Sequence, residues 1–400
     1  MSTSTSSRAS TLPVFLLSAA GFTVLTTEFV IVGLLPSMAR DLRVSVPQAG
    51  LLVTLFAFTV ATFGPVLTAW LSRFERKRMF VGTLIAVALS NLLSALAPNI
   101  WVMAFARFFP ALMLPVYWSL ASETVVEISG PKNAGTAISA FSLGPVLATI
   151  FGIPIGTLIG DHFGWRTAFA TLALLALLKA LLLFCCLPQI RLVAKQARFF
   201  RQFIILRDPK VLGNVLLSLL LFTGMFTAYT YLAAILEKLG NYSGSTVAWM
   251  LMGFGASGII GNWLGGKWVD RYPFGSTHLF SIIMGMATLA LTSSLSSWPW
   301  LALVLAVWGI CQSAIFPICH VRVMKTAAAY PALGASLNIS GANLGIGLGS
   351  LLGGRVIHIQ GLGSLGGAAA GVILIAVGLT FILQLSTQPA RTRHNPSGNT

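Results

Sequence analysis

Two ionisable residues, Glu28 and Arg107, lie inside stretches of the chain that are otherwise apolar. Glu28 comes eight residues before Pro36, and Arg107 comes seven residues after Ile100. If both stretches are helices that cross a bilayer, a rise of 1.5 Å per residue puts both side chains roughly 10 to 12 Å below the same surface. A carboxylate at that depth is costly, which makes Glu28 a functional candidate by default.

The combination of an acid and a base inside apolar stretches predicts proton chemistry. Burial favours the protonated form of a carboxyl group, whereas a nearby cation favours the ionised form. A conformational change that alters either influence therefore makes Glu28 take up or release a proton, with Arg107 as the residue that tunes it. Two structural alternatives remain, a static ion pair and an arginine whose side chain extends to the surface. Glu123, near the end of another apolar stretch, is the next acid to consider.

The composition of the chain indicates a membrane protein. Hydrophobic residues make up 56% of the 400 residues and charged residues 8%, with a mean hydropathy of +0.87. A water-soluble core cannot bury so much apolar surface. Spans of about 20 residues with short connections fit roughly a dozen helices into this length. We expect helices over residues 13–36, 48–71, 78–97, 100–122, 134–160, 165–187, 211–236, 243–268, 277–297, 299–321, 331–356 and 364–386.

Glycine and proline punctuate the fifth of these stretches. Gly152, Gly156 and Gly160 are four residues apart, so they form a stripe without side chains where a neighbouring backbone can approach closely. Pro145 and Pro154 each remove a helix hydrogen-bond donor and loosen the same segment. The pattern recurs 197 positions later, with Gly144, Gly152, Gly156 and Gly164 corresponding to Gly341, Gly349, Gly353 and Gly361. We therefore predict an all-α polytopic membrane protein of twelve helices in two pseudo-symmetric halves, the architecture of a rocking transporter.

One long basic connection divides the twelve stretches into two sets of six. The predicted parts are a disordered tail over 1–12, an N-terminal half over 13–187, a linker over 188–210, a C-terminal half over 211–386 and a tail over 387–400. The first apolar stretch is too long for the core of a signal peptide and has no clear cleavage site, so we expect it to be retained. The linker is expected to lie on acidic lipid.

The net charge of +16 follows the expected topology and gives no indication of nucleic-acid binding. Eighteen Lys and Arg residues lie in the tails and even-numbered connections, five lie in the odd-numbered connections, and two lie inside apolar stretches. Positive residues concentrate on the cytoplasmic side of membrane proteins, so both termini are expected to be cytoplasmic.

Neither metal binding nor enzymatic activity is expected. The four cysteines lie within predicted helices without metal-ligand spacing, and no cluster of His, Asp and Glu is present, so we expect no metal and no cofactor. The sequence GASG around Ser257 is similar to the nucleophile motif of rhomboid intramembrane proteases, with His278, His320 and His358 downstream as conceivable bases. Helix packing explains these small residues, and twelve spans with duplicated halves exceed what such a protease uses, so we favour packing over a protease.

Four segments give the chain a resemblance to a known family: TTEFVIVGLLPSMARDL, GIPIGTLIGDHFGWRTAF, GNWLGGKWVDR and NISGANLGIGLGSLLGG. The chain resembles the major facilitator superfamily, and within it the twelve-helix drug:proton antiporters that include arabinose-efflux-permease-like and nucleoside-efflux proteins. The resemblance implies a proton-coupled efflux antiporter, a monomer in the bacterial inner membrane, with a drug, sugar or nucleoside as substrate. A proton-coupled importer of the same fold is the alternative. In that family the glycine-proline motif of helix 5 is associated with antiporters, and helices 1, 4, 7 and 10 line a central cavity.

The chain departs from the family in the connection after the second helix. The family pattern there has an Asp-Arg pair followed by Gly and basic residues, whereas WLSRFERKR has Ser72 and Glu75 in the Asp and Gly positions. The second copy, GGKWVDR, keeps the pair. The residues assigned by resemblance to a cytoplasmic latch are Arg73, Arg76, Asp270 and Arg271.

Candidate substrate contacts are the polar and aromatic residues on the helices that the family places around the cavity. Packing alone also accounts for aromatic residues at such positions. The candidates are Thr27, Tyr117, Trp118, Tyr229, Tyr231, Phe316, His320 and Asn343. Protons, lipid and a small molecule are the expected partners.

Overall fold

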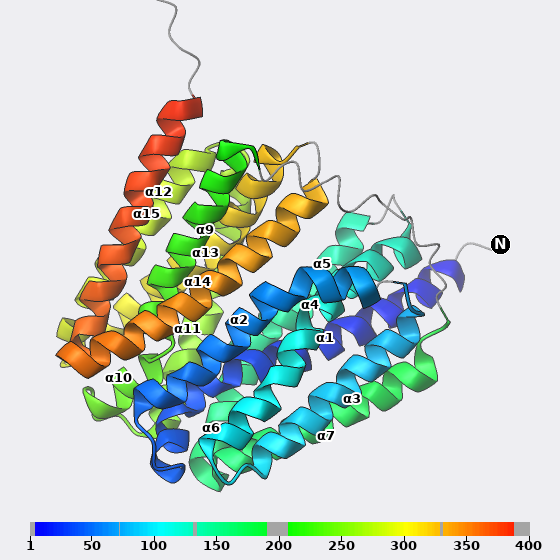
Figure 1. Ribbon diagram of the computed structural model, residues 1–400, viewed down its shortest axis with the longest axis horizontal. Helices are drawn as coiled ribbons and strands as arrows, with labels where there is room; N and C mark the ends of the chain where they lie inside the picture. The colour runs from blue at the N-terminus through cyan, green and yellow to red at the C-terminus, as the bar shows by residue number, and fades with distance from the viewer. Residues whose placement is uncertain (1–4, 72, 131–133, 190–206, 329–330, 388–400) are drawn as a thin grey trace, which may run out of the picture.

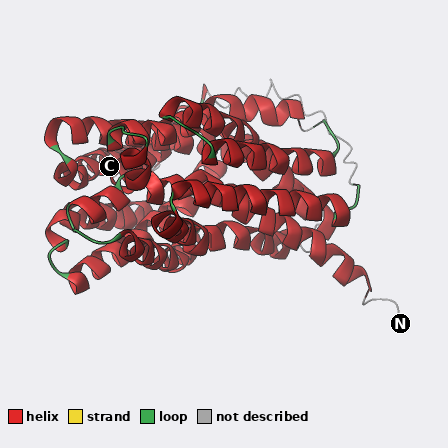
Figure 2. Cartoon of the chain, turned by 90° about the horizontal axis from the view of Figure 1, so that it is seen from below, coloured by secondary structure: helices red, strands yellow, loops and turns green. Residues whose placement is uncertain are grey.

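The computed structural model describes residues 5–71, 73–130, 134–189, 207–328 and 331–387. Helices make up nearly all of these residues, and Figure 2 shows no strand among them. The helices are α1 (Thr5–Asp41), α2 (Val46–Leu71), α3 (Arg76–Ala95), α4 (Ile100–Ser129), α5 (Ala134–Leu147), the π-helix η2 (Ala148–Gly152), α6 (Ile153–Phe163), α7 (Trp165–Cys186), α9 (Pro209–Tyr229), α10 (Leu232–Lys238), α11 (Gly244–Val269), α12 (Pro273–Ser294), α13 (Trp298–Thr326), α14 (Pro331–Gln360), the 3₁₀-helix η4 (Leu362–Ser364) and α15 (Leu365–Thr387).

Each of the twelve predicted stretches is helical, which confirms the predicted fold class. Among the described residues, eleven helices are long and apolar enough to cross a membrane. The eleventh predicted stretch, 331–356 in α14, is not one of them, because its Gly, Ser and Asn residues lower its hydropathy. The prediction of a disordered tail over 1–12 differs from the structure, in which α1 begins at Thr5. Adding turns to an existing helix costs much less than nucleating one, which accounts for the extension.

The glycine stripes lie against neighbouring helices. Three glycines of α5, η2 and α6 face α1, and three glycines of α14 face α9. The contacts are Gly144 with Ser18, Gly152 with Thr26 and Gly156 with Val30 in the first set, and Gly341 with Val215, Gly349 with Thr223 and Gly353 with Thr227 in the second. Each of the six residues in the first set lies 197 positions, one repeat, before the corresponding residue of the second set. The duplication read from the glycines therefore extends to the residues that they contact.

Gly164 and Gly361 show the same correspondence in the backbone. Both have a φ of 87°, a conformation that residues with a Cβ rarely adopt. Gly164 ends α6 and Gly361 follows α14, so equivalent glycines reverse the chain at equivalent places.

The segment around Pro154 is not a regular α-helix. Pro154 has no N–H to donate to the carbonyl of Ile150, and the five residues of η2, which include Ile150, form a π-helical turn. The backbone of Thr149, in this turn, lies against Gly255 of α11. The predicted loosening of this segment thus takes the form of a π-bulge, placed where α11 contacts it.

Helices from the two sets of six meet along α2 and α14, which Figure 1 shows side by side, and along α11, which packs against η2 and α6. Tyr231 Oη donates to the Ser350 carbonyl at 2.8 Å, and Ser350 Oγ donates to the Gly50 carbonyl of α2 at 2.8 Å. Thr54 Oγ1 donates to the Gly347 carbonyl at 3.3 Å. These contacts lie toward the end of the molecule where α1 finishes at Asp41, which we call the Asp41 end.

Candidate functional site

Arg107 is buried on α4, with its side chain 1% exposed, and it binds the backbone of α1. Its Nη1 donates to the Thr27 carbonyl at 2.9 Å and its Nη2 donates to the Glu28 carbonyl at 2.8 Å. Its Cζ lies 4.9 Å from the centroid of the Phe56 ring on α2. Two carbonyl dipoles and an aromatic face therefore surround the buried cation, each of which favours positive charge.

Asn91 of α3 binds the same turn of α1. Its Nδ2 donates to Thr27 Oγ1 at 3.0 Å and to the Val87 carbonyl at 3.0 Å. Nearby, Ser90 Oγ donates to the Ala106 carbonyl at 2.7 Å. These bonds tie α1, α3 and α4 together at the level of Glu28. Asn91 was missed in the sequence, although an amide in the middle of an apolar stretch is a signal for a buried polar contact.

Glu28 is half-buried on α1, and Arg107 is the charged group whose field acts on it. The five ion pairs found within the described residues do not include the two side chains. The ion pair considered from the sequence is therefore not formed in this conformation, since two donors of the guanidinium are engaged by main-chain carbonyls. The shared depth is nevertheless observed, because Arg107 contacts the carbonyl of Glu28 itself.

Thr27, Tyr117 and Trp118, the candidates of the first six helices, are packed against other helices. Thr27 is buried by the contacts described above. The Tyr117 hydroxyl donates to the Leu17 carbonyl at 2.5 Å, and its ring meets Phe80 edge-on at 5.9 Å. Trp118 is half-buried and meets Phe141 at 5.5 Å. Of the three, Trp118 retains the largest accessible surface.

The tyrosines of the seventh predicted helix lie where that helix breaks into α9 and α10. Tyr229 stacks on Phe254 of α11 at 5.4 Å and meets Trp308 of α13 at 6.5 Å. Tyr231 is fully buried, packs on Gly50 and Gly353, and binds the Ser350 carbonyl. Its side chain therefore belongs to the contact between helices at the Asp41 end.

Phe316, His320 and Asn343 lie on α13 and α14. Phe316 is 43% exposed and its ring lies 4.7 Å from that of Phe222. His320, one turn further on, is half-buried. Asn343 Nδ2 donates to the Ile339 carbonyl at 3.0 Å, and its Oδ1 is buried without a hydrogen-bond partner.

Comparison with known proteins identifies the family. The family model described as the Major Facilitator Superfamily matches residues 17–332 and 239–399. The chain belongs to the Major Facilitator Superfamily. Over 370 residues it is 32% identical to the inner membrane transport protein YdhP of Escherichia coli O157:H7, covering 91% of this chain and 95% of YdhP. It is 31% identical over 366 residues to a probable sugar efflux transporter of Pasteurella multocida, covering 91% and 89%.

A solved structure of the nucleoside transporter NupG shares the fold. Its TM-score against this chain is 0.77 at 15% identity, with 95% of this chain and 99% of NupG covered. The twelve-helix arrangement is thus the facilitator fold, and the chain is a membrane transporter by family.

The four residues assigned to the latch, two in each set of six helices, make the following contacts within their own set. Arg73 Nε donates to the Trp70 carbonyl at 2.8 Å, and Arg76 Nη2 lies 2.5 Å from Glu123 Oε2. Lys325 Nζ lies 2.7 Å from Asp270 Oδ1, and Arg271 lies over the Tyr272 ring. Ser72 lies outside the described residues. The cap of α3 is Glu75, whose carboxylate accepts from the Lys77 and Arg78 amides.

Ser257 makes the contacts of a packing residue in this facilitator. Its Oγ donates to the Phe254 carbonyl at 2.7 Å, and the side chain lies against Gly309 of α13. Of the conceivable bases, His278 instead lies 3.2 Å from Gln384.

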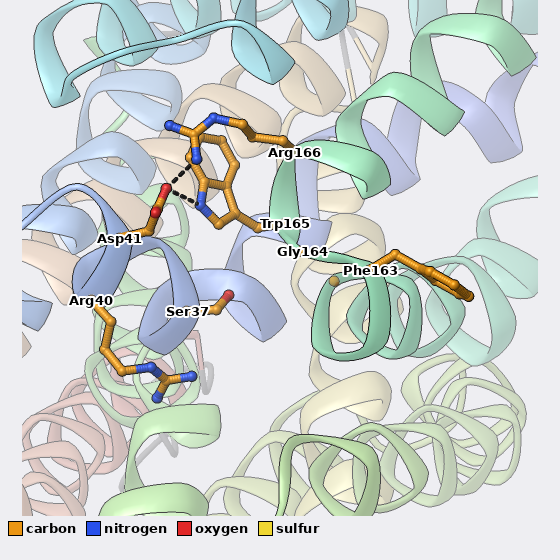
Figure 3. Close-up of a pocket in the computed structure, with 8 residues that line it drawn as sticks. Ser37, Arg40, Asp41, Phe163, Gly164, Trp165 and Arg166 are labelled. Atoms are coloured by element: carbon orange, nitrogen blue, oxygen red, sulfur yellow. Dashed lines mark hydrogen bonds and ion pairs between the residues drawn. The ribbon is translucent and has the colours of Figure 1, made fainter.

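A groove of about 560 Å³, lined by charged, aromatic and glycine residues, lies at the Asp41 end. Figure 3 shows Asp41 turned toward Trp165 and Arg166, whereas Arg40 points away from them. Asp41 Oδ2 accepts from Trp165 Nε1 at 3.0 Å and from Arg166, which also donates to the Ala97 carbonyl. Arg40 instead pairs with Glu237 of α10. Two adjacent residues of α1 therefore connect to different sets of helices.

Proposed function

We propose that this facilitator is a proton-coupled antiporter that exports a small neutral or weakly polar organic molecule, such as a drug, a sugar or a nucleoside. The observation that carries the proposal is the position of Arg107 against the Glu28 turn of α1. A carboxyl group inside a span, next to a cation that is fixed on another helix, changes its protonation when either helix moves. Efflux is supported by the relative named as a probable sugar efflux transporter.

The direction of opening follows from charge and contact together. The tails and even-numbered connections hold eighteen Lys and Arg residues, whereas the odd-numbered connections hold five. By the positive-inside rule, both termini then face the cytoplasm and the Asp41 end faces outward. The contacts between Tyr231, Ser350 and Gly50 then close the outer side. In this proposal two rigid halves, 13–187 and 211–386, rock about their boundary and expose Glu28 to each side in turn.

The energetics of the exchange are sufficient for export. Moving one charge through the membrane potential supplies about 2.3 kcal/mol per 100 mV. One proton exchanged for one neutral substrate therefore sustains a gradient of roughly fifty-fold at 100 mV. A single titrating carboxyl group is enough for this stoichiometry, and the proposal requires neither a metal nor a second protomer. The relative named as an inner membrane transport protein supports the bacterial inner membrane as the location.

Transport into inverted vesicles tests the proposal. With the cytoplasmic face outward, an acid lumen should drive substrate accumulation, and a protonophore should abolish it. The assay should compare a hydrophobic cation, a sugar and a nucleoside, each with and without the pH gradient. Substrate accumulation that does not depend on the pH gradient would contradict proton coupling. Proton-driven accumulation in right-side-out vesicles alone, under an inward proton gradient, would identify an importer.

A further inference from the structure

Four residues of α13 form a stripe whose exposure changes along the helix. Trp308, Gln312, Phe316 and His320 are four positions apart and therefore share one face. Trp308 is 0% exposed and Gln312 is 5% exposed, whereas Phe316 is 43% exposed and His320 is half-buried. The stripe thus runs from the packed interior to accessible surface nearer the Thr326 end of α13.

The packed part of the stripe carries a donor and an acceptor without partners. Trp308 Nε1 and Gln312 Oε1 are both buried, and neither has a hydrogen-bond partner among the described residues. Buried polar groups are almost always paired in folded proteins, so each orphan requires an explanation. These two side chains lie one helical turn apart on the same face, so they are placed to contact the same group.

Aromatic rings surround the indole. Phe254 of α11 lies 5.4 Å from Trp308 in an edge-on contact, and Tyr229 lies 6.5 Å from it. The Tyr229 and Phe254 rings stack on each other at 5.4 Å. Flat apolar surfaces beside a few fixed polar groups are the usual composition of a small-molecule site.

We propose that Trp308 and Gln312 form the part of the substrate site that reads hydroxyl groups, and that the substrate is a neutral polyhydroxylated molecule, either a free sugar or the sugar part of a nucleoside. A hydroxyl group donates and accepts at once, so one or two neighbouring hydroxyls satisfy both the indole N–H and the amide oxygen. A hydrophobic drug leaves both atoms unpaired. The inference rests on the proposed transport function, but it requires neither proton coupling nor a direction.

The hydroxyl-reading site belongs to one half of the molecule. One repeat of 197 positions before Trp308 and Gln312, the chain has Ala111 and Pro115. Neither has a polar side chain. The first half instead carries Glu28, which has Met225 as its counterpart one repeat later. Substrate reading and proton handling are therefore divided between the two halves.

Binding to the purified full-length protein tests this assignment without a pH gradient. The probes are glucose, arabinose, lactose, uridine and the hydrophobic cation tetraphenylphosphonium, measured by titration calorimetry and by the shift in Tm. Gln312→Met keeps the length of the side chain but removes its polar atoms. We expect it to lower the affinity for the hydroxylated probes roughly tenfold or more. Trp308→Phe should do the same by removing the donor. Binding of uridine alone assigns a nucleoside, and binding of a sugar assigns a free sugar.

The ligand-free Tm separates a binding role from a structural one. Removing an orphaned buried polar group is neutral or stabilising, so Gln312→Met should keep or raise the Tm. Ser281→Ala is the matched control, because Ser281 Oγ on α12 is also buried without a partner and lines a groove against α15. It should leave probe affinity unchanged.

Three results would overturn the assignment. The first is that no hydroxylated probe binds. The second is that Gln312→Met loses affinity for tetraphenylphosphonium as much as for the hydroxylated probes. The third is that the ligand-free Tm of Gln312→Met falls clearly while its probe affinities stay unchanged, which would indicate that a structural water bridges the two atoms. If the protein binds sugar but shows no proton-driven transport, the proposed proton coupling is wrong and the assignment of Trp308 and Gln312 stands.

Discussion

Arg40 Nη1 lies 2.9 Å from Glu237 Oε2, and the two residues are equivalent positions, 197 apart, in the two copies of the repeat. In a molecule with a pseudo-two-fold axis, equivalent positions meet only beside that axis. This ion pair therefore marks the place on the Asp41 end where the two halves meet about their symmetry axis. The neighbouring Asp41 binds Trp165 and Arg166 of its own half.

The Arg40–Glu237 pair is expected to favour the conformation closed at the Asp41 end. Its side chains are 62% and 15% exposed, and ion pairs with such exposure contribute about 0 to 1 kcal/mol. Glu237→Arg should therefore increase the open population by a few-fold, and the double exchange Arg40→Glu with Glu237→Arg should restore it. The measurement is the distance distribution between spin labels on the two halves at this end. Asp41→Asn is the control, because its contacts stay within one half; an equal shift in that variant would contradict the assignment.

The glycine stripes should tolerate no bulk. At Gly156 and Gly353 even a Cβ would collide with Val30 or with Thr227, so leucine there overpacks the contact, at about 1 to 3 kcal/mol. We expect transport to fall in Gly156→Leu and in Gly353→Leu while membrane insertion survives.

Gly371→Leu is the matched control for the stripes. Gly371 lies on α15 with open space where its Cβ would be, so leucine at this position should preserve transport. Full activity in both stripe variants would mean that α1 and α9 can move apart without loss of function.

The Ser350 hydroxyl is expected to hold α14 of one half against α2 of the other, because its Oγ donates to the Gly50 carbonyl. Ser350→Ala leaves the Gly50 carbonyl without this donor and keeps the Tyr231 bond, which goes to the main-chain carbonyl of residue 350. A net hydrogen bond is worth about 0.5 to 1.5 kcal/mol, so the open population at the Asp41 end should rise roughly two- to tenfold. Thiol labelling of a cysteine placed at Thr54, in a background without the native cysteines, reports the change. Unaltered labelling would show that the bond does not bias the equilibrium.

The sequence predicted the fold class and the positions of Glu28 and Arg107 because apolar length, glycine spacing and rare charges are properties of residue type. It did not predict the partners of Arg107, since these are main-chain carbonyls, which every residue has. Tyr231 was selected as an aromatic residue on a cavity helix, and its role in the helix contact depends on a break after Tyr229 that tertiary packing produces. Trp308 and Gln312 have ordinary residue types for a membrane helix, and only their lack of partners in the fold distinguishes them.

The central claim is that Glu28 carries the proton. Glu28→Gln keeps the shape of the side chain but cannot take up and release a proton. The comparison variant is Glu123→Gln, because the Glu123 side chain is largely exposed and pairs with Arg76. The deciding measurement is substrate accumulation in inverted vesicles with an acid lumen, alongside downhill exchange without a gradient. The account predicts that Glu28→Gln loses gradient-driven accumulation and retains downhill exchange, with Glu123→Gln active in both. Normal accumulation against a gradient by Glu28→Gln would contradict it, and loss of accumulation by Glu123→Gln would assign the coupling to Glu123 instead.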